Sequence, residues 1–154
     1  MSDERGDDVG GPDPSVIRSV AVTVDDVVAA VEAAERGRPR LVLRITPPFY
    51  GRMRARIHRE GGEGDYGDYE GNVDADPIHL APERFLAADA PPYPDVDEVE
   101  DRLRERGEYD VETHRSAYTE AVESWRTAVR DAFVDSVTVD TEAGPHEILV
   151  KRLG

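Results

Sequence analysis

Hydrophobic and polar residues alternate in several short stretches of the chain, and this alternation predicts β-strands. The first stretch is residues 16–22, which are rich in β-branched residues. A second covers residues 40–46 and ends at Pro47 and Pro48, because neither proline can donate a hydrogen bond to a neighbouring strand. A third covers residues 52–58. Further short strands are expected at 78–80, 137–140 and 147–153, and the last two form a C-terminal hairpin.

Other stretches repeat their hydrophobic residues every three or four positions, which predicts amphipathic helices. Thr23 with Asp26 resembles a capping box and Gly37 suits a helix end, so we expect a helix of about 13 residues between them. Asp95 begins a short helix that ends at Gly107. The longest helix, about 24 residues, is expected to be the spine of the core. Its apolar stripe comprises Val111, His114, Tyr118, Val122, Trp125, Val129 and Phe133.

The order of these elements predicts an α+β fold, with a mainly antiparallel sheet and helices packed on one face. A chain of 154 residues suits one domain. Residues 1–14 contain almost nothing apolar and predict a disordered acidic tail, so the α+β domain covers residues 15–154. Within it, residues 60–76 contain five glycines and seven acidic residues, which predicts a mobile acidic loop.

The composition narrows the cellular setting and the chemistry. The formal net charge is −15, there is no cysteine, and Lys151 is the single lysine beside 18 arginines. The lack of cysteine excludes disulfides, thiol catalysis and cysteine-bound metals. No apolar run approaches the roughly 20 residues of a membrane span, and the acidic start of the chain differs from a secretory signal. We therefore expect a cytoplasmic protein with no membrane partner.

One segment departs from this acidic background: residues 36–59 contain eight arginines and no acidic residue. On the strand 52–58, alternation places Met53, Ala55 and Ile57 towards the core and the basic residues on the other side. Paired with strand 40–46, this strand would form a hairpin with a cationic face. Like charges on neighbouring strands repel, and a bound polyanion would offset the repulsion.

This cationic face leads to the main functional hypothesis, a non-enzymatic protein that binds a polyanion, with nucleic acid as the favoured partner. Guanidinium groups bind phosphate through two parallel hydrogen bonds. Aromatic rings beside them, Tyr50 and Phe49, would stack on exposed bases. The expected contact residues are Arg40, Arg44, Tyr50, Arg52, Arg54, Arg56 and His58.

Three alternatives stay open at this point. The same face would also suit an adaptor that docks an acidic partner protein, anchored by Phe49 and Tyr50. The arginines would alternatively be paired with the chain's own acidic loop or helices, which leaves the function unknown. If residues 52–59 are helical, Arg52, Arg56 and Arg59 share a face and Arg54 leaves it.

The other candidate residues carry weaker signals. Asp74, Asp76 and His79 have the ligand types for a divalent metal, but such spacing arises easily in an acidic, glycine-rich loop. His114 lies on a helical stripe, which favours a hydrogen-bonded core residue. No nucleophile elbow, P-loop or dinucleotide motif is present. We therefore expect no cofactor and no metal and assign no catalytic residue, although an enzyme is not excluded; the oligomeric state is not predicted.

The stretch LRITPPFYGRMRARIH (residues 43–58), together with DPIHLAPERF (residues 76–85), resembles a family of small uncharacterised haloarchaeal proteins. The resemblance runs from about residue 17 to the C-terminus. It implies one domain in an archaeal cytoplasm and no established activity. In molar salt the Debye length falls to about 3 Å, so a basic surface would act by direct contact and not by long-range attraction.

Overall fold

The computed structural model describes residues 10–60 and 75–154, which form two compact units. The first unit contains the strands and takes its described residues from 10–60, 75–86 and 134–154, and the second covers residues 87–133. Residues 1–9 of the predicted tail and 61–74 of the predicted loop lie outside the described residues. The expectation of a single domain over residues 15–154 stays a prediction.

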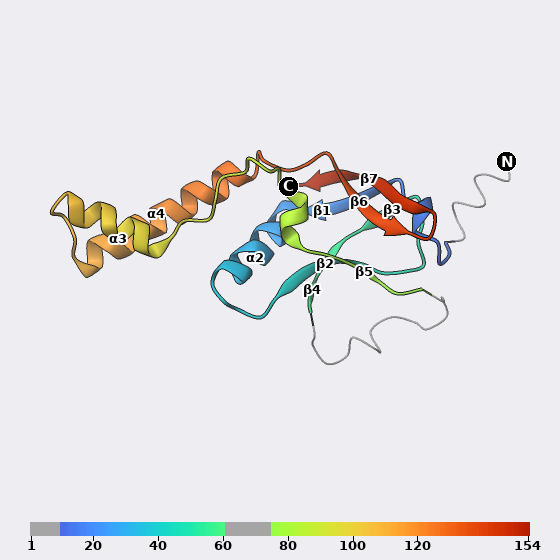
Figure 1. Ribbon diagram of the computed structural model, residues 1–154, viewed down its shortest axis with the longest axis horizontal. Helices are drawn as coiled ribbons and strands as arrows, with labels where there is room; N and C mark the ends of the chain where they lie inside the picture. Colours follow the sequence, from blue (N-terminus) through green and yellow to red (C-terminus); the bar gives the residue numbers. More distant parts are fainter. Residues whose placement is uncertain (1–9, 61–74) are drawn as a thin grey trace. The chain divides into compact units, whose positions relative to one another are not determined.

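A four-stranded sheet forms one layer of the first unit, in the order β3-β1-β7-β6 (Figure 1). Its strands are β1 (Ser19–Thr23), β3 (Arg52–Arg54), β6 (Ser136–Thr141) and β7 (Gly144–Leu153). β1 runs parallel to both β3 and β7, whereas β6 and β7 form the antiparallel hairpin that the sequence predicts. One side of the sheet is buried, and its residues include Val20, Val22, Val137, Val139 and Ile148.

A three-stranded antiparallel sheet completes the β-structure of the first unit, with β2 (Leu41–Ile45) between β4 (Arg56–Arg59) and β5 (Ile78–Leu80). β2 is a central strand, and four of its five residues are buried. The prediction that Arg44 lies on an exposed polar face of this strand is wrong. Because Val42 and Arg44 are buried along with Leu43 and Ile45, both sides of this strand are covered.

The predicted strand 52–58 is divided between the two sheets at Ala55. This residue is 1% exposed, and its amide donates a hydrogen bond to the carbonyl of Ala21 over 2.9 Å. Residues before it, in β3, pair with β1, and residues after it, in β4, pair with β2. The antiparallel pairing of the arginine-rich strands is confirmed only for β2 with β4. A small side chain at Ala55 suits a strand that turns from one sheet into another.

Helix α2 (Val24–Glu35) begins and ends at the signals that the sequence shows. The Thr23 hydroxyl accepts a hydrogen bond from the Asp26 amide, which caps the first turn. Gly37 adopts the left-handed conformation (φ +69°) that closes a helix end. The helix packs on β1, β2, β4 and the short helix η2 (Pro82–Phe85). Its buried face is slightly rotated from the predicted one and comprises Val24, Val27, Ala30, Val31 and Ala33.

The first described residues pair with a later segment of the chain. Gly11 exchanges two backbone hydrogen bonds with Phe49, of 3.1 and 2.7 Å. A short helix, η1 (Pro14–Val16), follows and is capped by the Asp13 side chain. The first strand therefore begins at Ser19 and not at residue 16.

The second unit is a helical hairpin of α3 (Val96–Glu105) and α4 (Val111–Val129). Helix α4 has 19 residues and ends before Phe133, so the predicted length of about 24 is wrong. Three polar groups on its apolar stripe bond to carbonyls of the preceding segment. These are the Trp125 indole to Pro91 (2.9 Å), the Tyr118 hydroxyl to Pro94 (3.3 Å) and the His114 imidazole to Val96 (3.1 Å). His114 is hydrogen-bonded, as predicted, but it is only half-buried and does not belong to the core.

The α+β class is confirmed, and three of the five strand pairings among the described strands are antiparallel. The expectation that the helices share one face of one sheet is wrong, because α2 packs within the first unit and α3 pairs with α4 in the second. Within residues 10–60 and 75–154, no helix has the length and apolar character needed to cross a membrane.

Candidate polyanion-binding site

The side of the four-stranded sheet opposite the core is the first candidate site. Residues directly opposite each other on paired strands point to the same side. The outward residues of the central strand β1 are small and only partly buried: Ser19, Ala21 and Thr23. Larger outward residues stand on both neighbouring strands. They are Arg52 and Arg54 on β3, and Leu149, Lys151 and Leu153 on β7. We call these eight residues the open face.

Three cations are arranged on the open face by strand register. Arg54 and Lys151 are both paired with Ala21, from opposite sides, so their Cα atoms are separated by two strand spacings, about 10 Å. Arg52 lies on the same strand as Arg54, about 6.7 Å away along it. The small side chain of Ala21 leaves the space between the longer cations open. An extended anionic chain that follows β1 would meet positive charge on both sides.

The arginines of β3 are available for such contacts. Arg52, Arg54 and Lys151 are exposed, and within the described ranges no carboxylate lies within ion-pair distance of any of them. Apolar groups accompany the cations: the Leu149 side chain is 50% exposed and that of Leu153 is 39% exposed. The open face therefore combines positive charge with apolar contact area. It offers no aromatic ring for base stacking.

Charge is distributed unevenly between the two units. The described residues of the strand-containing unit contain 12 basic and 12 acidic residues, whereas the helical hairpin contains 6 basic and 13 acidic residues. The described part of the first unit is therefore close to neutral within a protein of net charge −15. Towards β6 the outward side of the sheet becomes acidic, with Asp140 exposed and Glu147 accepting a hydrogen bond from Ser136. The positive part of this side is confined to β3 and the end of β7.

The structure brings together only part of the residue set that the sequence predicts. Arg40 forms an ion pair with Glu60 (3.0 Å) at the end of the three-stranded sheet. Phe49 is 1% exposed and belongs to the core, so its predicted role as a stacking ring or docking anchor is wrong. Tyr50 is 37% exposed, and its ring lies against Gly10, where an added Cβ atom would be 2.6 Å from the ring.

Arg44 and His58 lie on the three-stranded sheet, away from the residues of the open face. Arg44 is 7% exposed, and its Nη1 lies 3.0 Å from Nδ1 and 3.1 Å from Nε2 of His58. Arg56 is directly opposite Arg44, on the same side of the sheet. His79 on β5 is paired with Arg44. The ring centroids of His79 and His58 lie 5.4 Å apart, with the rings tilted to each other.

The sequence did not indicate that Lys151 belongs to the open face, or that His79 lies beside Arg44 and His58 on the three-stranded sheet. Lys151 is the single lysine of the chain, and it lies in a strand that the sequence predicts. Its pairing with β1 is a long-range contact that no local pattern indicates. Of the three residues with metal-ligand chemistry, Asp74 lies outside the described residues, and no group of three metal-binding side chains occurs within residues 10–60 and 75–154.

A family model matches residues 7–154, which include both units and the open face. The chain belongs to the DUF8009 family. DUF8009 is described as a domain of unknown function, so membership brings no activity to these residues. No curated protein and no solved structure matches the chain. The function of this DUF8009 chain has to be argued from its own side chains.

Proposed function

We propose that the protein binds nucleic acid, as an extended polyanion, through the open face of its four-stranded sheet. One observation carries the proposal: Arg52, Arg54 and Lys151 converge on this face, with no carboxylate beside them within the described residues. Guanidinium groups are suited to phosphate because each can donate two parallel hydrogen bonds.

The proposal narrows the residue set that the sequence indicates. Arg52 and Arg54 are the central contacts, and Lys151 joins them. Arg56 follows Arg54 beyond the turn at Ala55 and extends the basic row towards His58. Tyr50 precedes this row, with one side of its ring against Gly10. Arg40 and Arg44 are left out of the set, because Arg40 forms an ion pair with Glu60 and Arg44 contacts His58.

The proposed setting is a haloarchaeal cytoplasm, on the strength of the acidic, lysine-poor composition. In molar salt, attraction between separated charges is screened within about 3 Å. Binding would then depend on direct hydrogen bonds and on apolar contacts. The exposed Leu149 and Leu153 side chains contribute such contacts beside Lys151.

A second candidate function is an adaptor that docks an acidic partner protein on the open face. The exposed leucines favour this alternative, because large apolar side chains beside charged ones are typical of protein interfaces. The two functions differ in the ligand that the three cations select. A nucleic acid presents phosphates along its whole length, whereas an acidic peptide presents carboxylates and buries the leucines.

The test is fluorescence anisotropy with labelled single-stranded RNA, single-stranded DNA, duplex DNA and an acidic polypeptide, in molar potassium chloride. We expect binding to at least one nucleic acid and its loss in the triple variant Arg52→Gln/Arg54→Gln/Lys151→Gln. The matched control changes three exposed arginines of the helical hairpin, Arg102→Gln/Arg106→Gln/Arg115→Gln, and should retain binding. Equally weak binding of all three nucleic acids by wild type and triple variant would refute the proposal. Selective binding of the acidic polypeptide would support the adaptor instead.

A further inference from the structure

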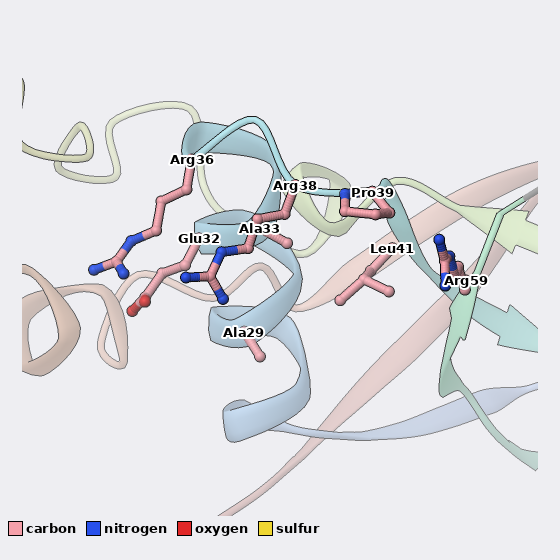
Figure 2. A pocket seen from close by; sticks show the side chains of 8 residues that line it. All are labelled: Ala29, Glu32, Ala33, Arg36, Arg38, Pro39, Leu41 and Arg59. Atoms are coloured by element: carbon pink, nitrogen blue, oxygen red, sulfur yellow. The ribbon is translucent and has the colours of Figure 1, made fainter.

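A pocket of about 440 Å³ lies beside the C-terminal part of α2, where the chain turns into β2 (Figure 2). Helix α2, the turn that follows it, β2 and β4 all contribute to its lining. The lining residues are Ala29, Glu32, Ala33, Arg36, Arg38, Pro39, Leu41 and Arg59. Its volume is within the range of about 300–1,000 Å³ that is common for small-molecule sites.

Local backbone structure explains how these residues meet. Gly37, with φ +69°, reverses the chain after α2, and the Arg38 amide then donates to the Ala33 carbonyl over 2.9 Å. This closes the helix end and leads the chain through Pro39 to β2. Leu41 is directly opposite Arg59 in the β2–β4 register, so both side chains point to the same side of the sheet. That side is the one that contributes to the pocket.

The pocket has an apolar floor and a basic rim. Ala29, Ala33, Pro39 and Leu41 supply aliphatic surface, and Figure 2 shows Arg59 at one end, opposite the arginines from the end of α2. Three arginines and one glutamate line it, which sums to a net charge of +2. A phosphate monoester has a charge of about −1.5 to −2 at neutral pH, so it matches this lining.

Two of the three arginines are available to a ligand. Arg38 and Arg59 are exposed, and neither is hydrogen-bonded or ion-paired through its side chain within the described residues. They reach the pocket from different elements, Arg38 from the turn after α2 and Arg59 from β4 (Figure 2). Figure 2 shows the Arg38 side chain directed towards Glu32 and away from Arg59, so the two guanidinium groups lie at opposite ends of the pocket. Arg59 is therefore the group that donates charge-assisted, bidentate hydrogen bonds to a phosphate at its end.

We propose that this pocket binds a small organic phosphate of about mononucleotide size, with the phosphate at Arg59 and the apolar ring system over Ala33 and Leu41. Arg36 adds positive charge at the rim. The inference is independent of the open face, because no residue of the pocket belongs to it. The pocket also uses the side of the three-stranded sheet opposite to Arg44, Arg56 and His58.

Isothermal titration calorimetry of the full chain tests the inference with three probes: adenosine monophosphate, adenosine and inorganic phosphate. We expect the nucleotide to bind at least about tenfold more tightly than either fragment, because only the nucleotide engages both rim and floor. Arg59→Gln should weaken nucleotide binding by about tenfold, through loss of a charge-assisted hydrogen bond, and Arg38→Gln, at the other end of the pocket, should weaken it less. Absence of nucleotide binding, or equal binding of nucleotide and inorganic phosphate, would overturn the inference.

Two further variants separate a specific site from general positive charge. Arg106→Gln removes the same charge from an exposed position in the helical hairpin, and it should leave nucleotide affinity unchanged. Ala29→Phe places a ring in the pocket from an exposed position of α2 and should abolish binding while the helical circular dichroism signal stays that of wild type. Nucleotide binding that survives Ala29→Phe, or that falls as far with Arg106→Gln as with Arg59→Gln, would contradict the pocket assignment.

Discussion

Replacing Arg54 with glutamine should change the salt dependence of nucleic-acid binding by a predictable amount. Each phosphate contact on a single strand contributes about −0.7 to the slope of the logarithm of the binding constant against the logarithm of salt concentration. The open face offers three cations, Arg52, Arg54 and Lys151, which predicts a slope of about −2.1. A tenfold rise in potassium chloride would then weaken wild-type binding about 100-fold, and Arg54→Gln binding only about 25-fold.

The assay is anisotropy of a labelled single-stranded oligonucleotide, titrated at several potassium chloride concentrations. Arg106→Gln is the matched control, because it removes the same charge from an exposed position in the helical hairpin. Its slope should equal that of wild type. If Arg54→Gln and wild type give the same slope, Arg54 does not contact phosphate. If both variants lower the slope equally, net charge and not the open face determines binding.

Three further predictions concern the scaffold. The Asp110 carboxylate caps α4 through hydrogen bonds that lower its pKa below 3.8, so its contribution to stability is complete above about pH 5 and is lost as the pH falls through the lowered folded-state pKa. Asp110→Asn should therefore reduce the loss of helical circular dichroism in acid. Trp125→Phe removes the hydrogen bond to Pro91 and should lower the free energy of unfolding by about 1–2 kcal/mol in urea titrations, while an unchanged midpoint would contradict this role. Ala55→Leu should cost about 1–3 kcal/mol by overpacking a residue that is 1% exposed, whereas Ala34→Leu on the exposed side of α2 should be nearly neutral in the same titration.

Local signals in the sequence were sufficient for many of the elements. The Thr23 cap and Gly37 define α2 to within one or two residues, because capping depends on atoms a few positions apart. The helical spacing of Tyr118 and Trp125 likewise predicts their packing side. The structural predictions were wrong where segments distant in the sequence lie side by side. The number of strands that flank β2 determines whether Arg44 is exposed, and no pattern within residues 40–46 shows it.

The candidate site illustrates the same division. Alternation along residues 52–58 correctly indicates that Arg52 and Arg54 are exposed. It does not indicate that β3 pairs with β1 instead of β2, nor that Lys151, near the end of the chain, stands across Ala21 from Arg54. The pocket at the end of α2 also escaped prediction, because the β2–β4 register, which is a long-range contact, places Arg59 beside Leu41.

By itself, therefore, the sequence determined which segments form helices and strands, where α2 is capped, and that the basic residues concentrate between residues 36 and 59. These properties follow from hydrogen bonds and side-chain periodicity over a few residues. Only the tertiary structure decided that the basic strand is divided between two sheets at Ala55 and that its arginines have Lys151 as a neighbour. The physical reason is that strand pairing joins backbone groups distant in sequence. Alternation specifies which side chains share a side of a strand but not which strand will lie beside it.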